Sequence, residues 1–227
     1  MSDTGSNADP SEAPPSIGTY EGDRAATGER HGKGRNTFPN GDVYEGEYHA
    51  GLRHGTGSYT WKRPKARYVG SYAENLRHGQ GAMVYPDGSR YKGQWVKGKR
   101  EGTGSYVYVN GDVYVGAWKE DLKDGEGIYV FAETGSKIKG HWQNNFLTGP
   151  AAIVHKDHIV KGNYAHVKET SPVDPEDDTL GTKDTITGAK LELPCSLLFK
   201  STGYVVDKCT VPEQVGLGAP AIAANDE

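Results

Sequence analysis

Recurring histidines are the first residues in this 227-residue chain that could carry chemistry. His31, His54 and His78 each precede a glycine at a regular interval, and clustered imidazoles are common zinc ligands. On successive units of a repeating sheet they would lie about two strands, or roughly 10 Å, apart, which is too far to share one ion. Glu101 and Asp124 take the same position later in the chain. The sequence therefore predicts structural histidines and no metal site.

A recurring Gly-x-Gly motif could suggest a phosphate-binding loop. It never continues to a third glycine three residues later and opens no expected helix, so it is not a dinucleotide fingerprint. No Gly-x-Ser-x-Gly nucleophile elbow occurs, and the carboxylates fall at turn or solvent-facing positions. We predict no enzymatic activity and no cofactor. The motif stands at Gly32-Lys-Gly34, Gly55-Thr-Gly57, Gly79-Gln-Gly81, Gly102-Thr-Gly104 and Gly125-Glu-Gly127.

Basic residues recur once in each of five units. They should form a line of positive charge along one edge of the molecule, with a spacing of about 10 Å. Such a line could dock an acidic partner surface. It could equally consist of solvated residues that pair locally with Glu29, Glu74 or Asp121, for about 0–1 kcal/mol per pair. The residues of this candidate basic stripe are Arg30, Arg53, Arg77, Arg100 and Lys123.

A second motif, Tyr-x-Gly-x-aromatic, sets the period of the chain. Its central glycines recur every 22 to 24 residues, and a fixed period of this length predicts a repeat protein whose units bury apolar surface against their neighbours. Function should then lie in an extended surface. The repeat-defining residues, including weaker copies at both ends, are Tyr20, Gly22, Tyr44, Gly46, Tyr48, Tyr68, Gly70, Tyr72, Tyr91, Gly93, Trp95, Tyr114, Gly116, Trp118, Gly140, Trp142, Gly162 and Tyr164.

Glycines and rings alternate with a spacing of two, which is the period of a β-strand. By this parity Gly55, Gly57, Tyr59 and Trp61 share one face of a strand. A glycine there leaves room for a neighbouring ring to lie across the strand. The resulting aromatic face is either a core or a groove for a partner segment.

Turn residues connect the expected strands. Asn40-Gly41, Asp87-Gly88 and Asn110-Gly111 predict hairpins in which both central residues have positive φ. The other connection carries Leu52, Leu76, Leu122 or Phe146, which we expect to form an apolar plug. The predicted fold is all-β: an elongated, single-layer antiparallel meander of twelve to fourteen strands, roughly 60 Å long, with a largely irregular C-terminal tail.

Composition divides the chain into three parts. We expect a disordered segment at 1–17, a repeat array at 18–166 with about six to seven units, and an acidic, mostly irregular tail at 167–227 with a possible docked hairpin at 191–206. Cys195 and Cys209 are expected to be reduced and incidental, which points to a reducing, intracellular compartment. No spanning segment or signal peptide is expected.

Charge is distributed unevenly behind a net value of −4. Residues 17–164 hold 21 Lys+Arg and 16 Asp+Glu, whereas both ends are acidic. This mildly basic array is consistent with a patterned binding surface. The excess is too small to predict binding to nucleic acid or to a membrane surface.

The repeat motif resembles the MORN repeat over about residues 18–164. Within that family, residues 20–35 (YEGDRAATGERHGKGR), 38–48 (FPNGDVYEGEY), 85–95 (YPDGSRYKGQW) and 132–137 (AETGSK) resemble the MORN-repeat proteins of the ciliary radial spoke head. Arg24 replaces the second aromatic of the first repeat, and Lys99 replaces a loop leucine.

This resemblance implies a structural, protein-binding subunit of the axoneme in a cilium or flagellum. Its implied partners are other radial spoke head subunits and central-pair projections, and it would help to relay signals to dynein. A homo- or heterodimer is compatible with this role. The alternative is a scaffold that binds anionic membrane lipids such as phosphoinositides, because MORN repeats elsewhere are linked to membranes.

Overall fold

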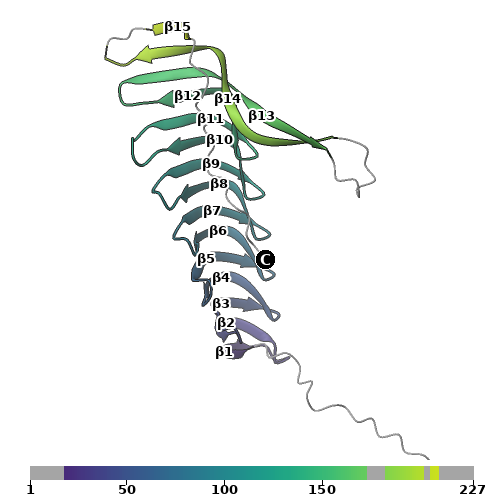
Figure 1. Cartoon of the computed structure of the whole chain (residues 1–227). Helices are drawn as coiled ribbons and strands as arrows, with labels where there is room; N and C mark the ends of the chain where they lie inside the picture. The colour runs from purple at the N-terminus through teal and green to yellow at the C-terminus, as the bar shows by residue number, and fades with distance from the viewer. Residues whose placement is uncertain (1–17, 173–181, 202–204, 210–227) are drawn as a thin grey trace, which may run out of the picture.

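A single antiparallel sheet makes up the computed structural model, which describes residues 18–172, 182–201 and 205–209. Each of its 15 strands pairs with the next in sequence, so the ribbon climbs in steps from β1 to β15 (Figure 1). The predicted all-β meander is confirmed. The strands are β1 Thr19–Arg24, β2 Arg30–Thr37, β3 Val43–His49, β4 Leu52–Trp61, β5 Ala66–Ala73, β6 Leu76–Val84, β7 Arg90–Val96, β8 Lys99–Val107, β9 Val113–Lys119, β10 Leu122–Val130, β11 Lys137–Gln143, β12 Phe146–Val154, β13 His158–Pro172, β14 Thr182–Phe199 and β15 Val205–Cys209.

A row of glycines crosses strands β1 to β13 at right angles to the chain. Each strand contributes one residue, directly opposite the next in the hydrogen-bonded register, and only β12 supplies alanine in place of glycine. Because these positions carry no side chain larger than a methyl group, the row leaves a channel along one face of the sheet. It consists of Gly22, Gly34, Gly46, Gly57, Gly70, Gly81, Gly93, Gly104, Gly116, Gly127, Gly140, Ala151 and Gly162.

Tyrosine rings fill this channel. A Cβ atom added to Gly93 would lie 2.4 Å from Tyr91 Oη and 2.6 Å from Gly104 Cα. The Tyr91 hydroxyl is fixed in place because it donates a hydrogen bond to the Gln94 carbonyl at 3.0 Å. Tyr44, Tyr68 and Tyr114 repeat both features in their own units. The glycines are thus needed because the rings lie flat on the backbone.

Edge-to-face contacts join the rings into a continuous ladder through the repeats. Neighbouring centroids lie 5.1–5.5 Å apart with interplanar angles of 82–90°, the arrangement favoured by the ring quadrupole. Most of these rings are almost fully buried, so a single-layer sheet has a core. We call this side the ring face. The ladder runs through Tyr20, Tyr48, Tyr44, Tyr72, Tyr68, Trp95, Tyr91, Trp118, Tyr114 and Trp142.

A bulge in the Gly-x-Gly strand shows that the face predicted for Gly55 was wrong. Gly46 pairs with Gly57, but the next residue, Glu47, pairs with His54, so Gly55 and Thr56 have no partner in β3, although both stay paired with β5. Gly55 has a φ of 60°, and a Cβ atom there would meet the Glu47 carboxylate instead of a ring. The prediction that both glycines clear space for rings was wrong for the first one, which serves the backbone conformation.

Turn geometry differs from the prediction at both ends of the strands. At Asn40-Gly41, Asp87-Gly88 and Asn110-Gly111 only the glycine has positive φ. Two consecutive residues with positive φ occur at the opposite connections, as in Glu74-Asn75 and Glu120-Asp121. The expected leucine plug was also wrong for the first two repeats, because the residue after such a tight turn leaves the ring face: Leu52 and Leu76 are exposed.

Beyond the repeats the chain continues in the same sheet. Strand β13 runs through the boundary expected at residue 166, and β14 pairs with it along most of its length, forming the long hairpin that projects beyond the other strands (Figure 1). Strand β15 pairs with β14 and places Cys195 opposite Cys209 in the backbone register. The expected disordered segment at 1–17 and much of the expected tail lie outside the described residues. No helix among the described residues is long and apolar enough to span a membrane.

Candidate interaction surfaces

The basic stripe lies on the ring face, where each cation covers aromatic rings. Arg77 Cζ is 4.4 Å from the Trp95 ring centroid, Arg100 Cζ is 4.6 Å from that of Trp118, and Lys123 Nζ is 4.4 Å from that of Trp142. Arg30 and Arg53 take equivalent places over Tyr48 and Tyr72, at 5.2 and 5.4 Å. Each cation thus contacts the second aromatic residue of the following repeat, a favourable cation–π arrangement.

Burial of the stripe increases toward its C-terminal end. Arg30, Arg53 and Arg77 are half-buried, whereas Arg100 is 7% exposed and Lys123 is 2% exposed. Burial lowers the pKa of Lys123 to about 8, because removal from water disfavours the ammonium form. The cations therefore cap the ring ladder and do not form a row of free surface charges.

Hydrogen bonds clamp each stripe residue to the tight turn of the next repeat. Arg100 donates to Asp121 from its backbone N at 2.8 Å and from Nε at 2.9 Å, and its Nη2 donates to the Asp121 carbonyl at 2.9 Å. In return the Asp121 amide donates to the Arg100 carbonyl at 3.1 Å. Asn75 accepts from Arg53 in the same way, and Asn145 accepts from the Lys123 amide.

This clamp matches one of the two interpretations that the sequence left open, and docking of an acidic partner stays a hypothesis. Local pairing occurs, and Asp121 is one of the partners that the sequence suggested. At Arg53 the partner is Asn75 and not the neighbouring Glu74. The turn residue at this position is what couples one repeat to the next.

Buried carboxylates stabilise the turns at the other ends of the strands, away from the tight turns. Asp112 Oδ2 accepts from the Tyr129 hydroxyl at 2.7 Å and from Asn110 at 2.9 Å, while Oδ1 accepts from the Ala132 amide at 2.8 Å. Burial by itself raises the pKa of this carboxyl, but these hydrogen bonds outweigh it and leave the pKa lowered. Asp42 makes equivalent bonds to Tyr59 and Lys62, and Ser89 replaces the carboxylate in a middle repeat.

Histidines gather near the N-terminal repeats without forming a metal site. His49 lies between the two expected positions, with ring centroids 5.1 Å from His31 and 5.8 Å from His54. The sequence argument, which placed successive histidines far apart, missed this intervening ring. Within the described ranges, no three His, Cys, Asp or Glu side chains are grouped so that they could hold an ion.

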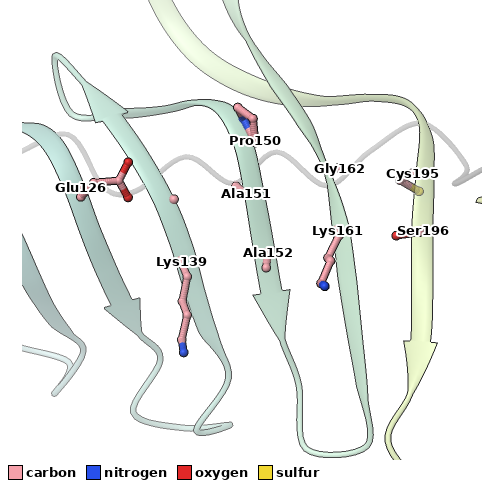
Figure 2. Close-up of a pocket in the computed structure, with 10 residues that line it drawn as sticks. Glu126, Lys139, Pro150, Ala151, Ala152, Lys161, Gly162, Cys195 and Ser196 are labelled. Atoms are coloured by element: carbon pink, nitrogen blue, oxygen red, sulfur yellow. The ribbon is translucent and has the colours of Figure 1, made fainter. Parts of the chain in front are cut away.

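A shallow hollow of about 690 Å³ lies across β10 to β14. It exists because the strands carry small residues here, including Pro150, Ala151 and Ala152 of β12, while Lys139 and Lys161 extend along its sides from the neighbouring strands (Figure 2). Sequence reasoning did not single out these lysines, because their proximity depends on the cross-strand register. The hollow is open, and its polar lining residues are Glu126, Lys139, Lys161 and Ser196.

Comparison with known families identifies the repeat unit. A family model for the MORN repeat matches residues 28–43, 44–63, 68–90, 91–113 and 114–135. These residues form a MORN-repeat array. The glycine row and ring ladder show that the same architecture continues through β1 and β11 to β13, outside the matched residues.

Two curated relatives share sequence with part of this MORN-repeat array. The Radial spoke head 1 homolog of Mus musculus is 52% identical over 48 residues, covering 21% of this chain and 16% of the relative. The Radial spoke head 1 homolog of Cyprinus carpio is 50% identical over 48 residues, covering 21% of this chain and 22% of the relative. The matched segment is thus less than a quarter of either relative.

Solved structures include a weak match to this chain. It is titled "SAS-4 (dCPAP) TCP domain in complex with a Proline Rich Motif of Ana2 (dSTIL) of Drosophila Melanogaster", with a TM-score of 0.36 and 14% identity over 58% of this chain and 69% of that chain. At this TM-score the likeness carries no functional argument.

Proposed function

We propose that this MORN-repeat protein is a structural subunit of the axonemal radial spoke head. The observation that carries the proposal is the 52% identity with the mouse Radial spoke head 1 homolog over 48 residues. The extended sheet supports it, because a repeat ribbon presents long surfaces to several neighbours at once. In this role the protein contacts other spoke-head subunits and central-pair projections, and it helps to pass mechanical signals toward the dynein arms.

The same observations favour a binding role over catalysis. The buried side chains of the array serve ring packing and repeat coupling, and the one hollow described above is lined mainly by small residues and lysines. MORN repeats and the radial spoke head relatives are both consistent with a structural protein.

The lipid-scaffold alternative loses the feature that motivated it. That proposal depended on the basic stripe as a free electrostatic surface, and the stripe residues instead lie over rings and bond to turns. Arg100 and Lys123 are buried, so these two cations cannot contribute the roughly 1 kcal/mol per residue that surface basic groups add at an anionic membrane.

Localisation tests the proposed function directly. An epitope-tagged full-length chain should co-purify with demembranated axonemes of ciliated cells and should stain along their length, including after detergent extraction. Crosslinking followed by mass spectrometry of those axonemes should recover spoke-head subunits. A diffuse signal that detergent removes entirely would contradict the proposal.

A further inference from the structure

The face opposite the rings carries two adjacent rows of aliphatic and basic residues across strands β5 to β13. The first row contains Arg67, Val84, Arg90, Val107, Val113, Val130, Lys137, Val154 and Ile159 in cross-strand register. The second row contains Val69, Ala82, Lys92, Ser105, Val115, Ile128, Lys139, Ala152 and Lys161. We call these two rows the basic-aliphatic face.

Large aliphatic side chains on this face are open to solvent. Val69 and Val115 are each 46% exposed, Val84 is 41% exposed, Val107 is 38% exposed and Ile128 is 37% exposed. Isolated exposed valines are ordinary, but Val107, Val115 and Ile128 lie on the adjacent strands β8 to β10, where the two rows hold no charged residue. On β7, Arg90 and Lys92 separate this apolar patch from Val69 and Val84. An exposed apolar patch flanked by charged residues indicates an interaction surface.

Charge on the face has one sign. The two rows contain six basic residues and no carboxylate, and all six basic side chains are exposed. On β1 to β4 the same rows are mixed in charge. Glu21, Arg35 and Glu45 follow one another there in the second row. The face therefore begins at β5, and its charge is complementary to an acidic partner.

The hollow lies at the C-terminal end of this face. Figure 2 shows Lys139 and Lys161 on either side of Ala152, and Ser196 adds a hydroxyl beyond Lys161. Glu126 is at the margin, in the next row, and its carboxylate pairs with His141 Nδ1 at 3.3 Å. The small residues leave room here for an acidic side chain to reach two ammonium groups.

We propose that the basic-aliphatic face binds an acidic segment of a partner protein that also carries aliphatic side chains. Its aliphatic groups pack on the patch formed by Val107, Val115 and Ile128, and its carboxylates pair with the flanking bases, two of which line the hollow. The inference goes beyond the proposed function and does not depend on it, since a surface of this chemistry would act in any assembly.

A protein segment fits this face better than an anionic membrane does. Helices and loops that lie at a membrane surface favour tryptophan, phenylalanine and leucine among their apolar residues. The apolar residues of the two rows are valine, isoleucine and alanine, and neither row contains an aromatic residue. β-Branched side chains on a sheet present a stiff surface that suits shape-specific packing.

Peptide binding to the full chain tests the proposal. The probe is a fluorescein-labelled synthetic peptide of about 12 residues that alternates Glu or Asp with Val or Leu, because nine strands span roughly 38 Å. Fluorescence anisotropy should show saturable binding to the wild-type chain that weakens as salt is added. A peptide with lysine in place of every acid should not bind.

Matched variants locate the site. Lys139→Gln combined with Lys161→Gln should weaken binding about tenfold, since two exposed ion pairs are lost. Lys65→Gln combined with Lys119→Gln makes the same change in net charge at exposed positions outside the two rows, and it should leave affinity within about twofold. Val115→Asp should abolish binding without lowering the unfolding temperature by more than a few degrees.

Three results would overturn the proposal. They are no binding of the acidic peptide, equal affinity of both double-lysine variants, or binding to vesicles containing about 30% phosphatidylserine that the acidic peptide cannot displace. The last result would assign the face to lipid. Because each assay uses purified protein, its outcome is separate from the axonemal localisation.

Discussion

At the scale of single residues, Gly93 shows how little freedom the ring face allows. The Tyr91 ring covers it from the same strand, and the glycine of the neighbouring strand lies directly opposite. β-Propensity alone would favour valine over glycine on a scale of about 1 kcal/mol. Overpacking a filled site costs about 1–3 kcal/mol, and the ring cannot move without losing its hydrogen bond to Gln94.

Gly93→Val should therefore destabilise the array by about 1–3 kcal/mol. Thermal unfolding followed by circular dichroism measures the change, and neighbouring repeats should share the loss because they are coupled. Gln94→Val is the control, since this exposed side chain points to the opposite face. If Gly93→Val is as stable as the wild type, the ring does not occupy the place described.

At the scale of elements, the tight turns connect one repeat to the next. The second residue of the tight turn is Asn75, Asp121 or Asn145 in three of the repeats. Its side-chain oxygen accepts a hydrogen bond from the backbone amide of the stripe residue in the preceding repeat. Asparagine and aspartate both suit this position, because they tolerate positive φ and supply an acceptor. Charge at this position is therefore secondary to hydrogen bonding.

Asp121→Asn should change stability little, because the amide oxygen can still accept from Arg100 as it does in the neighbouring repeats. Asp121→Ala should cost about 1–3 kcal/mol, since it leaves a buried donor without its partner. Urea unfolding of the two variants measures the difference. Glu120→Ala serves as a further control, because its 3.8 Å pair with Lys99 is exposed and should contribute about 0–1 kcal/mol. Equal losses for Asn and Ala at position 121 would show that the charge matters more than the acceptor.

At the scale of the whole molecule, the buried tyrosines predict a limit at alkaline pH. Burial raises the pKa of Tyr68, Tyr85 and Tyr164 to about 12, and it also raises the pKa of Tyr91 and Tyr114. In the unfolded chain these phenols ionise near pH 10. Their contribution to stability is therefore complete below about pH 10 and is lost as the pH rises toward the folded-state values.

Ionisation of Lys123 changes the stability in the opposite direction, over a lower pH range. Its pKa falls from 10.5 to about 8 on folding, so the unfolded state binds more protons between these values and stability rises with pH there. The urea midpoint should increase from about pH 8 to pH 10 and then fall steeply. Lys123→Met should remove the increase and keep the alkaline fall. Tyrosinate absorbance that rises below about pH 11, while the circular dichroism stays native, would contradict the assignment of buried phenols.

Local sequence pattern determined much of this protein. The period of the Tyr-x-Gly motif, the alternation of rings with glycines and the positions of the turns are properties of short segments, and they correctly predicted an antiparallel meander whose strands follow chain order. Resemblance of the same motifs to the MORN repeat gave the repeat type that the family model matches between residues 28 and 135. These features survive because strand parity and turn chemistry depend on residues only a few positions apart.

Tertiary structure decided which residues meet. The bulge at Gly55-Thr56 shifts the register with β3 by two residues, so the stripe cation Arg53 lies directly opposite Tyr48 and over the rings, while Leu52 is exposed. Cross-strand register then brings Lys139 and Lys161 together around Ala152, although 22 residues separate the two lysines in the chain. A sequence pattern fixes the alternation within one strand. The cross-strand partners on either side of a bulge are fixed only when the hydrogen-bonded strands settle into register.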